Sequence, residues 1–103
     1  MVKEKIEQKS GKENVIFVGT KPIMSYVNSV AIQFTKNNSK ELFIKARGKF
    51  TSKAIDITEI VKKKFSEQGK VEIANIKIDS SKFNNKEGKS INISTIEIKL
   101  TRK

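Results

Sequence analysis

The sequence contains no cysteine and no histidine, and its 103 residues include one proline and five glycines. Without cysteine, the chain can form no disulfide, thiolate metal site or cysteine nucleophile. Without histidine, it lacks the commonest general base and the commonest metal ligand in proteins. We therefore predict that the protein is not an enzyme, uses no metal or other cofactor, and has no small-molecule substrate.

Long hydrophobic runs are also absent, since no apolar stretch approaches the length of a membrane span. Residues 1–13 mix lysine and glutamate with little apolar content, so we predict a disordered tail there rather than a signal peptide. Residues 14–103 are enough for one domain. We expect a cytoplasmic protein that makes no contact with membranes.

Acidic residues are scarce relative to basic ones. The chain has 22 Lys and Arg against 11 Asp and Glu, which gives a formal net charge of +11. Such an excess of positive charge on a small domain favours a polyanionic partner, and nucleic acid is the simplest one.

Hydrophobic spacing predicts the element order strand, helix, strand, helix, strand, strand. Because a helix connects the first two strands, these strands should be parallel or separated by another strand, with both helices on one face. The predicted fold class is α+β, a two-layer sandwich with a four-stranded mixed sheet, two helices on one face and a long hairpin between the last two strands. The predicted strands cover residues 14–18, 40–46, 70–82 and 90–102, and the helices cover about 22–36 and 51–68.

Three finer features follow from the same spacing. The first strand is apolar throughout, so we expect both of its faces to be buried. The second helix should stop at Gly69, a residue type that suits the end of a helix. In each of the last two strands the apolar alternation changes phase midway, which predicts a bulge or burial on both sides.

The segment Asp79–Ser90 is almost entirely polar, and residues 84–89 have the composition of a hairpin tip. One interpretation is an ordinary solvated loop. The other is a paired arm of about six residues a side, which would project about 20 Å and could follow or enter a DNA groove. Lys82, Lys86 and Lys89 would line that arm.

Two short turns join a predicted strand to a predicted helix and carry cations. The first is Gly19-Thr20-Lys21-Pro22, and the second is Arg47-Gly48-Lys49. Taken alone, the first turn is slightly better explained without a phosphate site, with Gly19 and Pro22 serving only to form the turn and Lys21 solvated. Both turns leave the C-terminal ends of strands, however, so they can lie at one edge of the sheet and build one basic surface, with helix N–H groups that suit phosphate.

The second helix carries two further candidates. Asp56 and Glu59 could share a metal, but pairing of Glu59 with Lys63 and of Asp56 with Lys53 explains them better. Phe65 closes the apolar stripe of this helix amid lysines. It is either a core residue or, if partly exposed, a protein–protein contact.

Four stretches of the chain act together as a signature: Asn14–Val27 (NVIFVGTKPIMSYV), Ile44–Lys49 (IKARGK), Ser52–Asp56 (SKAID) and Ser94–Ile98 (STIEI). Together they closely resemble the Alba family of archaeal chromatin proteins, from about Asn14 to the C-terminus. The resemblance implies the same element order and a small basic homodimer. It also implies binding of double-stranded DNA, and often of RNA, with little sequence preference.

The resemblance further implies roles for individual residues. Lys21, Arg47 and Lys49 would contact the duplex from the body of the dimer, the two hairpins would act as arms, and Phe65 would lie where dimers meet side by side on DNA. Many members have two adjacent lysines after the glycine, and acetylation of the first weakens DNA binding. Here that position is Thr20, so this switch and part of the central contact are in question.

We therefore predict a homodimeric, largely sequence-independent double-stranded DNA-binding protein that coats and compacts the chromosome through phosphate contacts, with higher oligomers on DNA. The alternative is an RNA-binding protein or ribonucleoprotein component. A third possibility, from another class, is an interaction domain for an acidic protein. The predicted nucleic-acid-binding residues are Lys21, Arg47, Lys49, Lys53, Lys82, Lys86 and Lys89.

Overall fold

A computed structural model describes residues 14–66 and 70–102 of the chain. The predicted tail over residues 1–13 and the predicted helix stop at Gly69 lie outside the described residues. The elements are β1 (Val15–Phe17), α1 (Ile23–Thr35), β2 (Glu41–Arg47), a 3-10 turn η1 (Gly48–Phe50), α2 (Thr51–Lys64), β3 (Val71–Asn84) and β4 (Ser90–Arg102). Their order is the one predicted from hydrophobic spacing.

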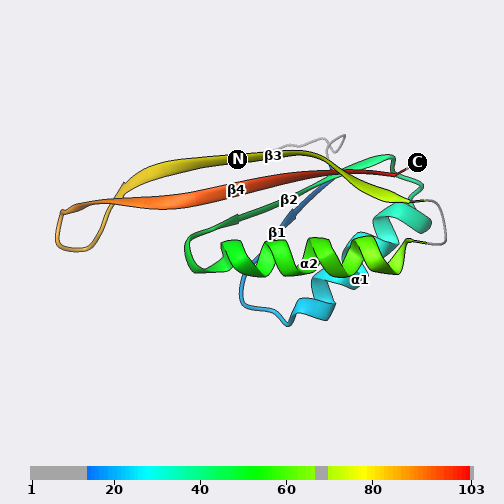
Figure 1. Cartoon of the computed structure of the whole chain (residues 1–103). Coiled ribbons are helices and arrows are strands. Elements are labelled where there is room, and N and C mark those ends of the chain that lie inside the picture. Colours follow the sequence, from blue (N-terminus) through cyan, green and yellow to red (C-terminus); the bar gives the residue numbers. More distant parts are fainter. Residues whose placement is uncertain (1–13, 67–69, 103) are drawn as a thin grey trace.

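The described residues form a four-stranded sheet in the order β1-β2-β4-β3. β1 runs parallel to β2, whereas β2 and β3 each pair antiparallel with β4. Both helices cover the same face of this sheet, and the β3–β4 hairpin projects beyond them (Figure 1). The predicted α+β fold with a mixed sheet is therefore confirmed. Neither helix in the described part of the chain is long and apolar enough to cross a membrane.

The core lies between the helices and one face of the sheet. The apolar stripe of α1 recurs every three or four residues, which places its members on one side of the helix. The stripe of α2 has the same spacing, and Thr58 within it satisfies its hydroxyl by donating to the Ala54 carbonyl at 2.9 Å. The buried residues of the helices are Tyr26, Val27, Val30, Phe34, Ala54, Ile57, Thr58 and Val61. Together with Phe65, which follows α2, they pack against Leu42, Ile44, Ile98 and Leu100 of the sheet.

β1 differs from its predicted burial on both faces. Ile16 packs against the core, but the next residue, Phe17, is 72% exposed. The reason is that the helices cover one face only and β1 is an edge strand, so alternate residues point away from the core.

α2 ends at Lys64, earlier than the predicted residue 68. Phe65 leaves the helical conformation (φ −102°, ψ 13°), and its N–H donates to the Val61 carbonyl at 3.1 Å. Its ring is 2% exposed and packs edge-on against Phe34 with the ring centroids 5.8 Å apart. The structure thus places Phe65 in the core, which is one of its two predicted positions, and its ring is not partly exposed; a contact of Phe65 between dimers stays a prediction.

The phase change in β3 is a bulge. The pairing with β4 passes from Ile73 directly to Asn75, so the intervening Ala74 has no partner and the following isoleucines return to the helix-covered side. β4 keeps a continuous register through its own phase change. Its Ile91 and Ile93 therefore lie on the opposite face of the strand from Ile96, and the bulge predicted as one option for both strands occurs in β3 alone.

The hairpin is paired along its whole length. The described pairs continue from Asp79 opposite Thr95 to Asn84 opposite Ser90, which confirms the paired arm of six residues a side over the solvated loop. Asn85 organises the tip, because its side-chain oxygen accepts the N–H groups of Glu87 at 2.9 Å and Lys89 at 3.0 Å. Gly88 adopts φ +80°, a conformation that glycine allows without strain.

Candidate nucleic-acid interface

The two cationic turns leave the same edge of the sheet. β1 and β2 are parallel, with Phe17 opposite Lys45, so the turn that carries Lys21 and the turn that carries Lys49 begin side by side. Each turn leads directly into a helix, and neither α1 nor α2 has an acidic residue in its first turn or a side-chain cap. Two positive helix ends therefore meet two cationic turns at this edge.

A set of contacts that we call the turn clamp, formed by Gly19, Tyr26, Phe50 and Lys53, joins the two turns. The buried Tyr26 hydroxyl accepts the N–H of Gly19 at 2.8 Å and the N–H of Lys21 at 3.2 Å. The Lys53 ammonium donates to the Gly19 carbonyl at 2.8 Å and lies 5.6 Å from the Tyr26 ring centroid and 5.8 Å from that of Phe50. The first turn is thus fixed to the start of α2.

Lys53 was predicted as a contact to nucleic acid, and the structure gives it a structural partner as well. One donor of its ammonium group is used by the Gly19 carbonyl, and an ammonium has three. Lys53 is therefore positioned between the two turns, with two donors left for further acceptors.

The other cations of these turns have no acidic partner in the part of the chain that the structure describes. Among the described residues, no ion pair engages Lys21, Arg47 or Lys49. The Lys49 ammonium lies 5.5 Å from the Phe50 ring centroid, which leaves its charge uncompensated. Gly48 lies between Arg47 and Lys49 and has φ +60°. The sharp bend that separates these two side chains therefore depends on glycine.

The remaining predicted cations lie on the arm. Lys82 lies on β3 and is paired opposite Asn92 of β4, whereas Lys86 and Lys89 lie in the turn between the two strands. Five residue pairs extend past the last β2–β4 pair, Arg47 with Thr95, and at about 3.4 Å per residue they reach about 17 Å beyond it. The arm projects from the end of the sheet at which β2 leads into η1 and α2 (Figure 1).

Other lysines are neutralised within the fold. Lys45 pairs with Glu97 at 3.4 Å, Lys99 with Glu41 at 3.5 Å and Lys62 with Glu59 at 3.2 Å. Glu59 thus has a lysine partner, although at i,i+3 rather than the predicted Lys63. In the described ranges no three Asp or Glu side chains are grouped so that they could hold a metal.

The role of Tyr26 was not predicted from the sequence. The signal was available in its chemistry. A tyrosine hydroxyl on a buried helix face needs a hydrogen-bond partner, and the nearest unpaired backbone groups belong to the preceding turn. Its distance to Lys53 could not be foreseen, because the two residues come from different helices.

We expect Tyr26→Phe to lower the free energy of unfolding by about 1–2 kcal/mol, because it leaves two backbone N–H groups without their acceptor. Urea denaturation measures this change. Ser29→Ala is the matched control, since it removes an exposed hydroxyl of the same helix that donates to the Ser25 carbonyl. Equal stability of the two variants would contradict a stabilising role for the clamp.

Comparison with known proteins agrees with this architecture. A family model described as Alba matches residues 14–80. The DNA/RNA-binding protein Alba of Picrophilus torridus is 48% identical over 91 residues, which covers 88% of this chain and 98% of that protein. The protein of the same name from Thermoplasma acidophilum shows the same identity and coverage over 91 residues. The solved structure of Alba from Thermoplasma volcanium superposes with a TM-score of 0.77 at 45% identity, over 86% of this chain and 100% of that one.

A mixed sheet covered on one face by two helices, with paired basic turns at one edge and a projecting hairpin, defines a small α+β protein with the fold of the Alba structure. Both the match over residues 14–80 and the identity to relatives along nearly their whole length make the assignment specific. The chain belongs to the Alba family.

Proposed function

We propose that the protein is a dimeric, largely sequence-independent double-stranded DNA-binding protein that coats and compacts chromosomal DNA. One observation carries this proposal: Lys21, Arg47 and Lys49 lie on two short turns at one sheet edge, and the turn clamp fixes the first turn to the second helix. Cations that are already in place lose little conformational entropy on binding.

Phosphate is the ligand that this surface favours. Lys21 and Lys49 are point charges, and the cations of the arm are all lysines. Lysine reads base edges poorly, whereas it binds phosphate well. A surface of this kind fixes the register of a duplex without selecting its sequence, which suits a protein that coats DNA.

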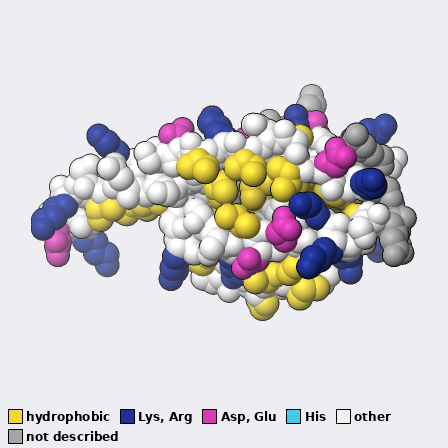
Figure 2. Space-filling view, viewed as in Figure 1, with side chains coloured by type: hydrophobic (Ala, Val, Ile, Leu, Met, Phe, Trp, Pro, Cys, Tyr) yellow, Lys and Arg dark blue, Asp and Glu magenta, His cyan; other side chains and the backbone are white. Residues whose placement is uncertain are grey.

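Dimerisation is supported by an apolar surface left open on the helix-covered side of the sheet. Ile76 and Ile78 pair with Ile98 and Ile96, so they share the face that packs against the helices. Among the strands, however, α2 packs mainly against β2 and β4, which leaves Ile76 50% and Ile78 74% exposed. Hydrophobic side chains form one patch where β3 passes above α2 (Figure 2). A second copy is the partner that would cover it.

RNA is the second candidate ligand. The relatives from Picrophilus torridus and Thermoplasma acidophilum are named DNA/RNA-binding proteins. The sugar-phosphate backbones of DNA and RNA are both polyanions. The two ligands differ in groove geometry, since the major groove of A-form RNA is deep and narrow. Competition between duplex DNA and structured RNA at equal salt would separate them.

The turns and the arms should contribute unequally to duplex binding. We expect Lys21→Ala or Arg47→Ala to weaken binding about tenfold or more, as loss of a pre-positioned charged hydrogen bond does. Lys86→Ala or Lys89→Ala should cost less than about fivefold, because exposed charges on a turn contribute little. Fluorescence anisotropy on two unrelated duplexes at fixed salt measures these losses.

Lys36→Ala is the charge-matched control for this comparison, because Lys36 follows the C-terminal end of α1, away from the turns. All variants should act equally on both duplexes. A larger loss for the arm variants would make the arms the principal contact. A variant that changes the ranking of the two duplexes would mark a residue that reads bases or groove shape.

A further inference from the structure

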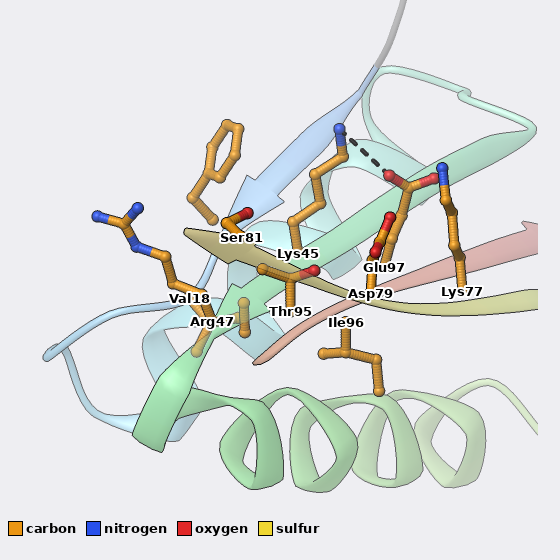
Figure 3. A pocket seen from close by; sticks show the side chains of 11 residues that line it. Val18, Lys45, Arg47, Lys77, Asp79, Ser81, Thr95, Ile96 and Glu97 are labelled. Carbon is orange, nitrogen blue, oxygen red and sulfur yellow. Dashed lines mark ion pairs between the residues drawn. The ribbon is translucent and has the colours of Figure 1, made fainter. Parts of the chain in front are cut away.

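The face of the sheet that the helices do not cover carries a groove. Its volume is about 510 Å³, which is within the range of roughly 300–1,000 Å³ typical of small-ligand sites. Lys45, Lys77, Asp79, Thr95 and Glu97 gather on one side of the strands, while Ile96 points toward α2 on the other side (Figure 3). The remaining lining residues are Phe17, Val18, Ala46, Arg47 and Ser81.

The register places an aromatic ring at the β1 end of this groove. Phe17 lies opposite Lys45, which lies opposite Glu97, so one row of side chains crosses the sheet. Lys45 and Glu97 form an ion pair at 3.4 Å and neutralise each other. Phe17 is 72% exposed at the end of that row. An aromatic face is thus presented to solvent beside a neutralised pair.

The neighbouring row offers hydrogen-bonding groups. Arg47 lies opposite Thr95, which lies opposite Asp79, and Ser81 follows two residues along β3. Arg47 has no ion pair within residues 14–66 and 70–102. Its guanidinium can bind a phosphate bidentately. The hydroxyls of Thr95 and Ser81 and the carboxylate of Asp79 can accept from exocyclic amino groups of a base.

We propose that this groove binds an unpaired nucleotide of single-stranded nucleic acid, with the base stacked on Phe17, the phosphate on Arg47 and the base edge toward Asp79, Ser81 and Thr95. Stacking of bases on exposed aromatic side chains beside cations is the general mode of single-strand recognition. A duplex keeps its bases stacked on each other and offers Phe17 no base face. The site therefore goes beyond duplex binding and shares only Arg47 with it.

Other occupants fit the groove less well. A second copy of the chain would seek the apolar patch of Ile76 and Ile78, which lies on the opposite face of the sheet. An acidic peptide would meet the carboxylates of Asp79 and Glu97, and it would gain nothing from Phe17. A nucleotide uses the ring, the guanidinium and the acceptors together.

The test uses a 12-nucleotide single-stranded DNA of mixed sequence and a duplex of the same sequence. We expect Phe17→Ala to weaken binding of the single strand by about 5- to 150-fold, whereas Phe17→Tyr retains it. Binding of the duplex should be unchanged in both variants. Ile32→Ala is the matched control, since Ile32 is an exposed apolar residue of α1 at 47% exposure.

Two further measurements locate the effect. The salt dependence of single-strand binding should have the same slope in Phe17→Ala as in the natural protein, because no phosphate contact is lost. Backbone amide resonances of Ser81 and Thr95 should shift when the single strand is added. Arg47→Ala should weaken binding of both the single strand and the duplex.

Failure of this inference can be told apart from failure of the proposed function. If Phe17→Ala binds the single strand as tightly as the natural protein, the groove is not the site, whatever the duplex affinity. If Phe17→Ala instead changes the sedimentation of the free protein, a second copy occupies the groove and the inference is overturned. Loss of duplex binding alone would count against the duplex function and leave this site standing.

Discussion

Raising the salt concentration from 50 to 200 mM should lower the affinity for duplex DNA by about 10³- to 10⁵-fold. Each chain carries a net charge of +11, so a dimer carries 2 × 11 = +22. If the dimer neutralises roughly 6–10 phosphates, the slope of log affinity against log salt should be about −5 to −9, because each contact releases condensed counterions.

Titrations of random and defined duplexes across this salt range measure the slope. Lys21→Ala should reduce its magnitude by about one for each phosphate contact removed, while Lys36→Ala should leave it unchanged. A slope near zero would contradict phosphate neutralisation. Absence of duplex binding, together with a salt-sensitive complex with an acidic protein, would favour the interaction-domain alternative. A strong preference for one sequence would show that base readout dominates.

The second large effect should come from Ile78→Lys. Ile78 is 74% exposed in the described fold, so a lysine there should leave the protomer folded but place a charge in the proposed dimer interface. We expect the dimer to dissociate to an 11.7 kDa species in sedimentation at micromolar concentration. Duplex affinity should then fall by about 100-fold or more, because two linked binding surfaces become one.

This substitution separates the effect of charge from the effect of assembly. It adds one positive charge, which by itself strengthens attraction to DNA, so a loss of affinity must come from the loss of the dimer. Ile32→Lys makes the same change at an exposed position of α1, and this variant should keep both the dimer and the affinity for the duplex. A natural protein that sediments as a monomer, or an Ile78→Lys variant that remains dimeric, would rule out this interface.

Much of the fold could be predicted from the sequence because its elements are strongly periodic. Val27, Val30 and Phe34 recur at helical spacing, which predicts one apolar helix face, and all three are fully buried. The position of both cationic turns at one edge also followed, since parallel strands end on the same side of a sheet. Local pattern and strand direction were enough for these features.

Features that depend on distant contacts could not be predicted in the same way. The phase change in the sequence of β3 predicts an irregularity in that strand, but only the pairing with β4 shows that the bulge lies at Ala74. Phe65 sits at the right helical spacing for the core, yet its burial depends on Phe34 of the other helix. The hydrogen bond from Lys53 to Gly19 joins residues 34 positions apart. Such contacts arise from how layers pack, which hydrophobic spacing does not encode.

The three-residue β1 has a consequence for the timing of folding. Within the described sheet it is an edge strand that pairs with β2 alone, and it can pair only after α1 has closed the intervening chain. The β3–β4 hairpin, by contrast, forms between segments adjacent in sequence and has a short loop to close. We therefore expect the turn that carries Lys21 to form late in folding and to be among the first parts to open, so a bound polyanion would stabilise this edge of the domain against local unfolding.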